Sequence, residues 1–215
     1  AAAGIKPITV RQERTGLHMA DAMSRVSSGK KVGVFCMQHG PGLENALGAV
    51  AQAYSESVPL LVIPGGYDRR LAHVDPNFSA PKNMAHYTKS VEQLTSGAEL
   101  SNVFRRAFTQ LRNGRGGPCV VEIPKDLWNE EVPENFDYHP VIATRYMPDP
   151  AAIREAAERL AKAKNPVIYA GQGVHYAQAW PQLRMLAELL AAPVCTSLEG
   201  KSSFPENHPL ALGAG

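Results

Sequence analysis

Residues 32–45, VGVFCMQHGPGLEN, join a short apolar run to a glycine turn and then to a segment of helical character. A short apolar run rich in branched residues is typical of a buried parallel strand. The turn places Pro41 between Gly40 and Gly42. Strand, turn and helix in this order predict one unit of an open α/β sheet, in which ligands bind outside the carboxyl ends of the strands.

The same alternation continues along the chain. Further apolar runs cover residues 60–63, 119–123, 166–170 and 193–195, and each predicts a strand. Apolar residues at the i, i+3, i+4, i+7 spacing predict an amphipathic helix over residues 100–111, and similar patterns predict helices over 151–164 and 183–190. We therefore expect the α/β class, with an open parallel sheet and helices on both of its faces.

Residues 129–147 interrupt this pattern, because they are charged, punctuated by proline and without period. We expect them to link a first domain, residues 1–128, to part of a second, Rossmann-like α/β domain, residues 148–215. The second segment shows only two clear strands, which are too few for an independent sheet. It therefore leans on the first domain or belongs to a longer chain.

Composition excludes several classes of function. The 22 lysines and arginines nearly balance 20 aspartates and glutamates, and the absence of a basic stripe argues against nucleic-acid binding. No apolar run approaches the ~20 residues of a membrane span. Cys36, Cys119 and Cys195 lie far apart inside apolar runs, so we expect buried free thiols, a reducing cytoplasmic location and no metal ligands among them.

Three stretches carry candidate functional residues. Glu13 in residues 10–20, VRQERTGLHMA, follows the apolar run 7–10, and a carboxylate at such a strand end is either solvated surface or functional. Residues 38–45 form either a tight strand-to-helix turn or a ligand site, with His39 inside it. The stretch Gly171-Gln172-Gly173-Val174 is an incomplete dinucleotide fingerprint, and a plain turn explains it equally well.

These motifs together resemble a known family. The stretches VRQERTGLHMA, GPGLEN and GRGGPCVVEIPKDLW are similar to the N-terminal, pyrimidine-binding domain of thiamine-diphosphate enzymes of the acetolactate synthase and 2-oxo acid decarboxylase type. The stretches NPVIYAGQGV and TSLEGKSSFPENHPLALG resemble the start and middle of the central domain of that family. The resemblance spans nearly the whole chain.

The resemblance implies a role for each candidate. The Glu13 carboxylate would contact the pyrimidine ring nitrogen of thiamine diphosphate and stabilise the tautomer that takes the thiazolium proton. An apolar cleft would raise the pKa of this carboxyl. His39 would act as an acid or orient the substrate, and Gly40, Pro41, Gly42 and Asn45 would form the wall beside the cofactor. From the residues alone, Asn45 also suits the opening of a helix.

The implied enzyme is a lyase or transferase that decarboxylates or joins small 2-oxo acids. It would be a homodimer or homotetramer with Mg²⁺ held by a third domain, so we expect this chain alone to be inactive. The central domain of some relatives binds FAD or a nucleotide. Gln12 stands where histidine is frequent, which would change how the Glu13 carboxylate is held, and Phe78 lacks the usual following glutamine, which weakens the match to acetolactate synthesis. The alternative is a non-catalytic or regulatory nucleotide-binding subunit centred on residues 171–174.

Overall fold

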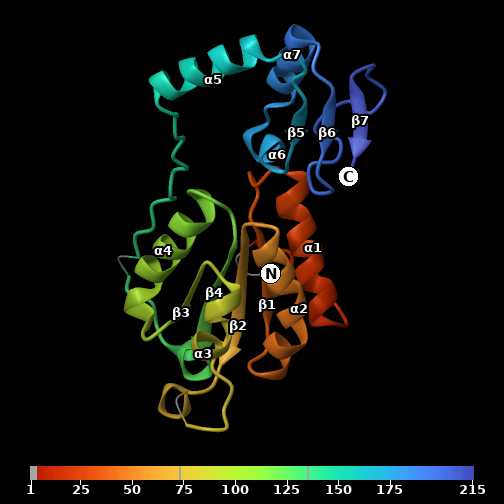
Figure 1. Cartoon of the computed structure of the whole chain (residues 1–215). Helices are drawn as coiled ribbons and strands as arrows, with labels where there is room; N and C mark the ends of the chain where they lie inside the picture. Colours follow the sequence, from red (N-terminus) through yellow and green to blue (C-terminus); the bar gives the residue numbers. More distant parts are fainter. Residues whose placement is uncertain (1–3, 73, 135) are drawn as a thin grey trace. The chain divides into compact units, whose positions relative to one another are not determined.

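The computed structural model describes residues 4–72, 74–134 and 136–215. The chain divides into two compact units, Ala1–Thr144 and Arg145–Gly215, and each is described by itself (Figure 1). The predicted linker, residues 129–147, spans this division. No described helix combines the length and the apolar character that crossing a membrane requires.

The first unit is built on a parallel sheet of order β1-β2-β4-β3 (Figure 1). Its strands are β1 (Gly33–Met37), β2 (Leu60–Gly66), β3 (Ser90–Gln93) and β4 (Pro118–Pro124). Strands β1, β2 and β4 confirm the strands that were predicted from the first three apolar runs. Sequence reasoning missed β3, because its four residues, SVEQ, are all half-buried and include three polar side chains.

Helices cover both faces of this sheet, which confirms the predicted fold class. The helices of the first unit are α1 (Glu13–Val26), α2 (Pro41–Ser55), α3 (Ala80–Met84) and α4 (Leu100–Arg112), with the short turns η1 (Arg69–Leu71), η2 (Ala85–Tyr87), η3 (Gly97–Glu99) and η4 (Lys125–Asn129). Successive residues of a strand point to opposite faces. Accordingly, Leu60 and Val62 join the core under α1, α2 and α3, whereas Leu61 joins the core under α4.

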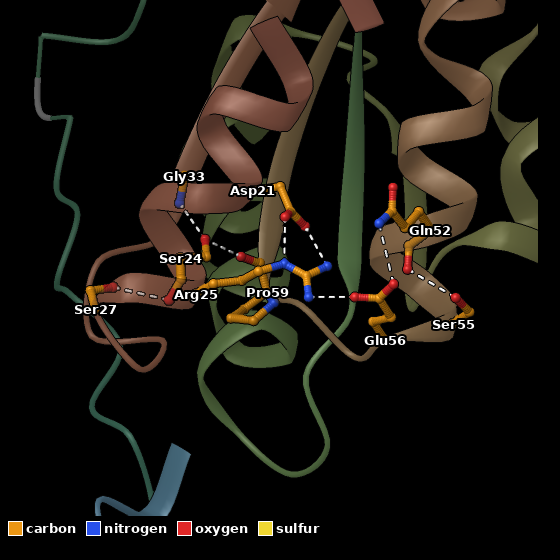
Figure 2. A network of polar contacts seen from close by, with 9 residues as sticks. All are labelled: Asp21, Ser24, Arg25, Ser27, Gly33, Gln52, Ser55, Glu56 and Pro59. Carbon is orange, nitrogen blue, oxygen red and sulfur yellow. Dashed lines mark hydrogen bonds and ion pairs between the residues drawn. The ribbon is translucent and has the colours of Figure 1, made fainter. Parts of the chain in front are cut away.

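A small polar network fastens α1 to the sheet (Figure 2). The Ser24 hydroxyl is fully buried, donates to the Pro59 carbonyl at 2.6 Å and accepts from the Gly33 amide at 2.8 Å. Beside it, Arg25 forms ion pairs with Asp21 and with Glu56. The end of α1 is therefore fixed to the start of β1 and to the residue that precedes β2.

The apolar run 7–10 does not form a strand, so Glu13 is the first residue of α1 and not the end of a strand. A strand needs a partner for its backbone hydrogen bonds. In the described part of the chain, β1 is the outer strand of the sheet and no strand pairs with its free edge. The expectation from the sequence was wrong at this point.

The cysteine expectation was also only partly right. Cys119 on β4 is buried, and burial raises the pKa of its thiol. Cys195 is half-buried and Cys36 is exposed. Cys36 lies on the outer strand β1, which pairs only with β2 in the described part of the chain.

Residues 137–144 run beside α4 and belong to the first unit. The Ser101 hydroxyl donates to the Asp137 carbonyl at 3.0 Å, and the Thr144 amide donates to Asn113 Oδ1 at 2.7 Å. These contacts hold an otherwise irregular segment against the helix.

The second unit has a parallel sheet of order β5-β6-β7. Its elements are α5 (Pro150–Lys162), β5 (Ile168–Ala170), α6 (Gly173–Ala177), α7 (Trp180–Leu190), β6 (Val194–Thr196) and β7 (Ala211–Ala214). Ala170, Leu183, Ala187, Val194 and Phe204 form its core. The predicted strands β5 and β6 and helices α5 and α7 are confirmed. Strand β7, ALGA, has no β-branched residues and was missed.

Candidate cofactor site

Glu13 and Asn45 lie against each other where α1 and α2 begin. The Asn45 side-chain amide donates a hydrogen bond to Glu13 Oε2 at 2.7 Å. Glu13 is the first residue of α1, and Asn45 lies one turn inside α2. Asn45 therefore does not cap its helix, as its residue type suggested, but binds a carboxylate 32 residues away.

This contact changes the expected ionisation of Glu13. The Asn45 amide, followed by Glu13's own backbone amide, lowers the pKa of the carboxyl below its ordinary value, and desolvation opposes them only weakly. Hydrogen bonds donated to a carboxylate favour its charged form. In the chain by itself, the half-buried carboxylate therefore has a lowered pKa, and the rise expected in an apolar cleft beside the pyrimidine stays a prediction.

Each residue of the glycine turn, Gly40, Pro41 and Gly42, suits its position for a different physical reason. Gly40 precedes α2 with φ +58°, a conformation that residues with a side chain rarely adopt. Pro41 is the first residue of α2, where its missing N–H costs nothing. A methyl group added at Gly42 would lie 3.0 Å from Gln38 Cγ and 3.2 Å from Met37 Cβ. The turn therefore packs tightly on the end of β1.

His39 contacts Tyr67, which sequence reasoning did not identify. Their rings meet edge to face with centroids 4.8 Å apart, and both residues are half-buried. Tyr67 directly follows β2, the neighbour of β1 in the sheet. Its position directly after a strand parallel to β1 could have predicted this contact, because the carboxyl ends of adjacent parallel strands lie at the same edge of the sheet. The structure thus joins Glu13 to Asn45 and His39 to Tyr67.

Other polar side chains of the first unit form ion pairs within the fold or are exposed. Arg69 forms ion pairs with Asp126 at 2.7 Å and with Glu130 at 3.1 Å. The Arg69 guanidinium also lowers the pKa of Asp126. His18 on α1 and His86 in η2 are exposed.

In the second unit, Gly171 follows β5 and Gly173 opens α6, a helix of five residues. The loop after β6 approaches this turn closely, because a methyl group added at Gly200 would lie 2.5 Å from the Ala170 carbonyl oxygen. Among the described residues, no group of three or more His, Cys, Asp or Glu is arranged to hold a metal ion.

Comparison with known proteins identifies this arrangement. Residues 1–95 match the sequence model of the thiamine pyrophosphate enzyme N-terminal TPP binding domain, and residues 153–215 match the central domain of the same enzymes. The chain belongs to the thiamine pyrophosphate enzyme family. Its glycine turn and Glu13 lie in the N-terminal TPP binding domain.

Relatives of this family member are similar over most of the chain. The acetolactate synthase large subunit of Buchnera aphidicola subsp. Schizaphis graminum is 36% identical over 217 residues, which cover 95% of this chain and 37% of that protein. The acetolactate synthase isozyme 3 large subunit of Escherichia coli (strain K12) is 34% identical over 222 residues, covering 98% of this chain and 38% of that protein. The chain thus spans less than two-fifths of the length of these relatives.

A solved structure shows the same fold. The benzoylformate decarboxylase of Polynucleobacter necessarius superposes with a TM-score of 0.85 at 30% identity, covering 94% of this chain and 38% of that protein. The α/β architecture described above is therefore shared with a larger enzyme.

The residues at the site fit the aminopyrimidine part of thiamine pyrophosphate. An ionised carboxylate offers about four acceptor positions, so Glu13 can take a hydrogen bond from a ring nitrogen while it keeps the one from Asn45. Gly40 itself carries no side chain, and a methyl group added there would meet only the Tyr67 hydroxyl oxygen at 3.8 Å and Phe78 Cβ at 4.0 Å.

Proposed function

We propose that this chain forms the pyrimidine-binding side of an enzyme that uses thiamine pyrophosphate to break or make the carbon–carbon bond next to the carbonyl of a 2-oxo acid. The hydrogen bond between Asn45 and Glu13 carries the proposal, because it directs a carboxylate at the start of α1. The resemblance to acetolactate synthases and to a benzoylformate decarboxylase supports the substrate class.

When bound, thiamine pyrophosphate supplies a thiazolium carbon that acts as a nucleophile toward the substrate carbonyl. Glu13 would hold the pyrimidine ring by its carboxylate and could share a proton with the ring nitrogen. Ring binding removes water from this half-buried group, and desolvation raises the pKa of a carboxyl. The lowered pKa of Glu13 would therefore rise toward a value suited to sharing a proton.

Asn45 acts as a positioning residue for Glu13. An amide that donates to one carboxylate oxygen restricts the side-chain rotamers, so less freedom is lost when the ligand binds. We assign Gly40, Pro41 and Gly42 to the wall beside the ring. His39 orients the substrate or donates a proton, with Tyr67 packed against its imidazole.

The proposal includes Mg²⁺ as the ion that holds the diphosphate, although no described residue of this chain is assigned as its ligand. It also includes a homodimer or homotetramer in the cytoplasm. No role is assigned to FAD, because the turn at residues 171–173 offers only a short helix start.

The test compares two neighbouring glutamates in the protein as its source makes it. Glu13→Gln removes the carboxylate at the site, whereas Glu44→Gln removes an exposed carboxylate in the first turn of α2. Pyruvate and benzoylformate are assayed with thiamine pyrophosphate and Mg²⁺. We expect Glu13→Gln to lower kcat by roughly 10²–10⁴, the usual size of a general acid–base contribution, and Glu44→Gln to leave it unchanged. Equal activity of the Glu13→Gln variant and the wild-type enzyme refutes the proposal.

A further inference from the structure

Glu122 is a buried acid that the proposed chemistry does not use. It lies on β4 and is 2% exposed. Its Oε1 accepts the backbone amide of Ala80 at 3.1 Å, and its Oε2 accepts the side-chain amide of Gln93 at 2.7 Å. Burial of a carboxylate costs free energy unless donors compensate it. Glu122 therefore links the start of α3 to strand β3 through these two hydrogen bonds.

The Ala80 amide is one of the unpaired donors at the start of α3. The preceding residue, Ser79, provides no side-chain cap, so a strand residue supplies the acceptor instead. Ala80 and Met84 are buried in the core shared with α1 and α2. Glu122 thus fixes where α3 begins relative to the sheet.

Glu122 also limits the size of the residue that β2 can have at position 66. A methyl group added at Gly66 would lie 3.0 Å from Glu122 Cγ and 3.1 Å from Glu122 Cδ. Only glycine at position 66 leaves that space without displacement of the acid. Tyr67, the next residue, packs on His39.

Two of the segments that touch Glu122, the start of α3 and the end of β2, continue into the wall of the glycine turn. Phe78 precedes Ala80 by two residues and packs on the same core. A methyl group added at Gly40 would lie 4.0 Å from Phe78 Cβ and 3.8 Å from the Tyr67 hydroxyl oxygen. The start of α3 and the end of β2 therefore meet at Gly40, and Glu122 lies against both.

We propose that Glu122 is a positioning residue for the candidate site, which holds Phe78 and Tyr67 against the Gly40 turn through the start of α3 and the end of β2. The expected effect of Glu122 on cofactor binding rests on the proposed function. The position of Phe78 and Tyr67 beside Gly40 does not rest on it, because that position can be measured without cofactor.

The test measures that placement by amide hydrogen exchange and backbone chemical shifts. Glu122→Met keeps the length of the side chain and its flexibility but removes both acceptors. Loss of a hydrogen bond to this buried carboxyl group predicts roughly tenfold or faster exchange at Ala80, with shifts of the Gly40 and Phe78 resonances. Glu122→Gln retains an oxygen for the Ala80 amide, and Gln93 can turn its own amide, so protection returns.

Glu92→Met is the matched control, because Glu92 lies on the neighbouring strand β3 and pairs with Arg106 at 2.6 Å. It leaves the Ala80 and Gly40 signals unchanged. If the Glu122→Met chain does not fold, Glu122→Asp keeps the charge but withdraws it by one methylene group, and the same changes are expected. A folded Glu122→Met or Glu122→Asp variant with normal exchange at Ala80 and unmoved Gly40 overturns the inference.

A second arm separates this inference from the proposed function. Thiamine pyrophosphate is titrated into the wild-type, Glu122→Met and Glu122→Gln proteins, and Gly40 and Asn45 shifts report binding. We expect weaker binding by Glu122→Met and recovery in Glu122→Gln. Absence of any shift in the wild-type protein refutes the proposed function but leaves the exchange result at Ala80 to decide the role of Glu122.

Discussion

Asn45 Nδ2 lies 2.7 Å from Glu13 Oε2 and joins the first turns of two packed helices through a single hydrogen bond. The bond lowers the pKa of Glu13 from its ordinary value of 4.5. Asn45→Leu removes the donor, so we expect the pKa of Glu13 to rise. The measurement is a carbon-13 titration of glutamate carboxyl groups by NMR.

The same pKa shift predicts how stability depends on pH. A carboxyl whose pKa is lower in the folded than in the unfolded chain contributes stability above its unfolded pKa, and this contribution disappears as pH falls through the folded pKa. The difference in unfolding free energy between the wild-type chain and Asn45→Leu should therefore be largest at neutral pH and shrink below about pH 4.5. Asn102→Leu is the control, because Asn102 donates to Glu99 at 3.3 Å. A difference that does not change with pH contradicts the assignment.

Three glycine substitutions separate backbone strain from crowding. Gly40→Ala places a side chain at φ +58°, which costs about 1–3 kcal/mol although the added methyl group meets only ordinary contacts. Gly42→Ala presses on Gln38 and Met37 and requires them to move. Gly48→Ala adds a methyl group to the interior of α2 with nothing within 4 Å, and should stabilise by roughly 0.5–1 kcal/mol. Urea unfolding gives all three values, and a Gly40→Ala chain as stable as Gly48→Ala would be inconsistent with the turn.

The polar network of Figure 2 predicts a loss of stability far from the site. Ser24→Ala leaves the Gly33 amide and the Pro59 carbonyl without their buried partner. The expected cost is about 1–3 kcal/mol of unfolding free energy. Ser55→Ala, whose hydroxyl donates only to the Gln52 carbonyl on the exposed side of α2, serves as control and should cost far less. Equal losses of unfolding free energy in the Ser24→Ala and Ser55→Ala variants would contradict this prediction.

Sequence periodicity identified the elements whose residues carry a strong apolar pattern. Strand β4, PCVVEIP, is continuous and buried, whereas β3, SVEQ, is partly polar and takes its place by pairing with β4. The run at 7–10 has strand-like residues but no described partner. A local apolar pattern therefore predicts a strand correctly only where another strand can pair with its backbone or other elements can bury its side chains.

Sequence motifs proposed residues for the candidate site but could not give their contacts. The positions of Glu13 and of the glycine turn followed from their motifs. The contact between Asn45 and Glu13, the packing of Tyr67 on His39 and the role of Glu122 depend on residues distant in sequence. The direction of the pKa shift of Glu13 could not be predicted without those contacts.

The most direct test of the central claim is the response of the Glu13 carboxyl to thiamine pyrophosphate. The carboxyl resonance of Glu13 is followed by carbon-13 NMR while the cofactor and Mg²⁺ are added, with an analogue that carries carbon in place of the facing pyrimidine nitrogen as control. We predict a saturable shift and a raised pKa of Glu13 with the cofactor, and little pKa change with the analogue. A Glu13 resonance and pKa that stay constant while other residues of the chain respond to the cofactor would contradict the account.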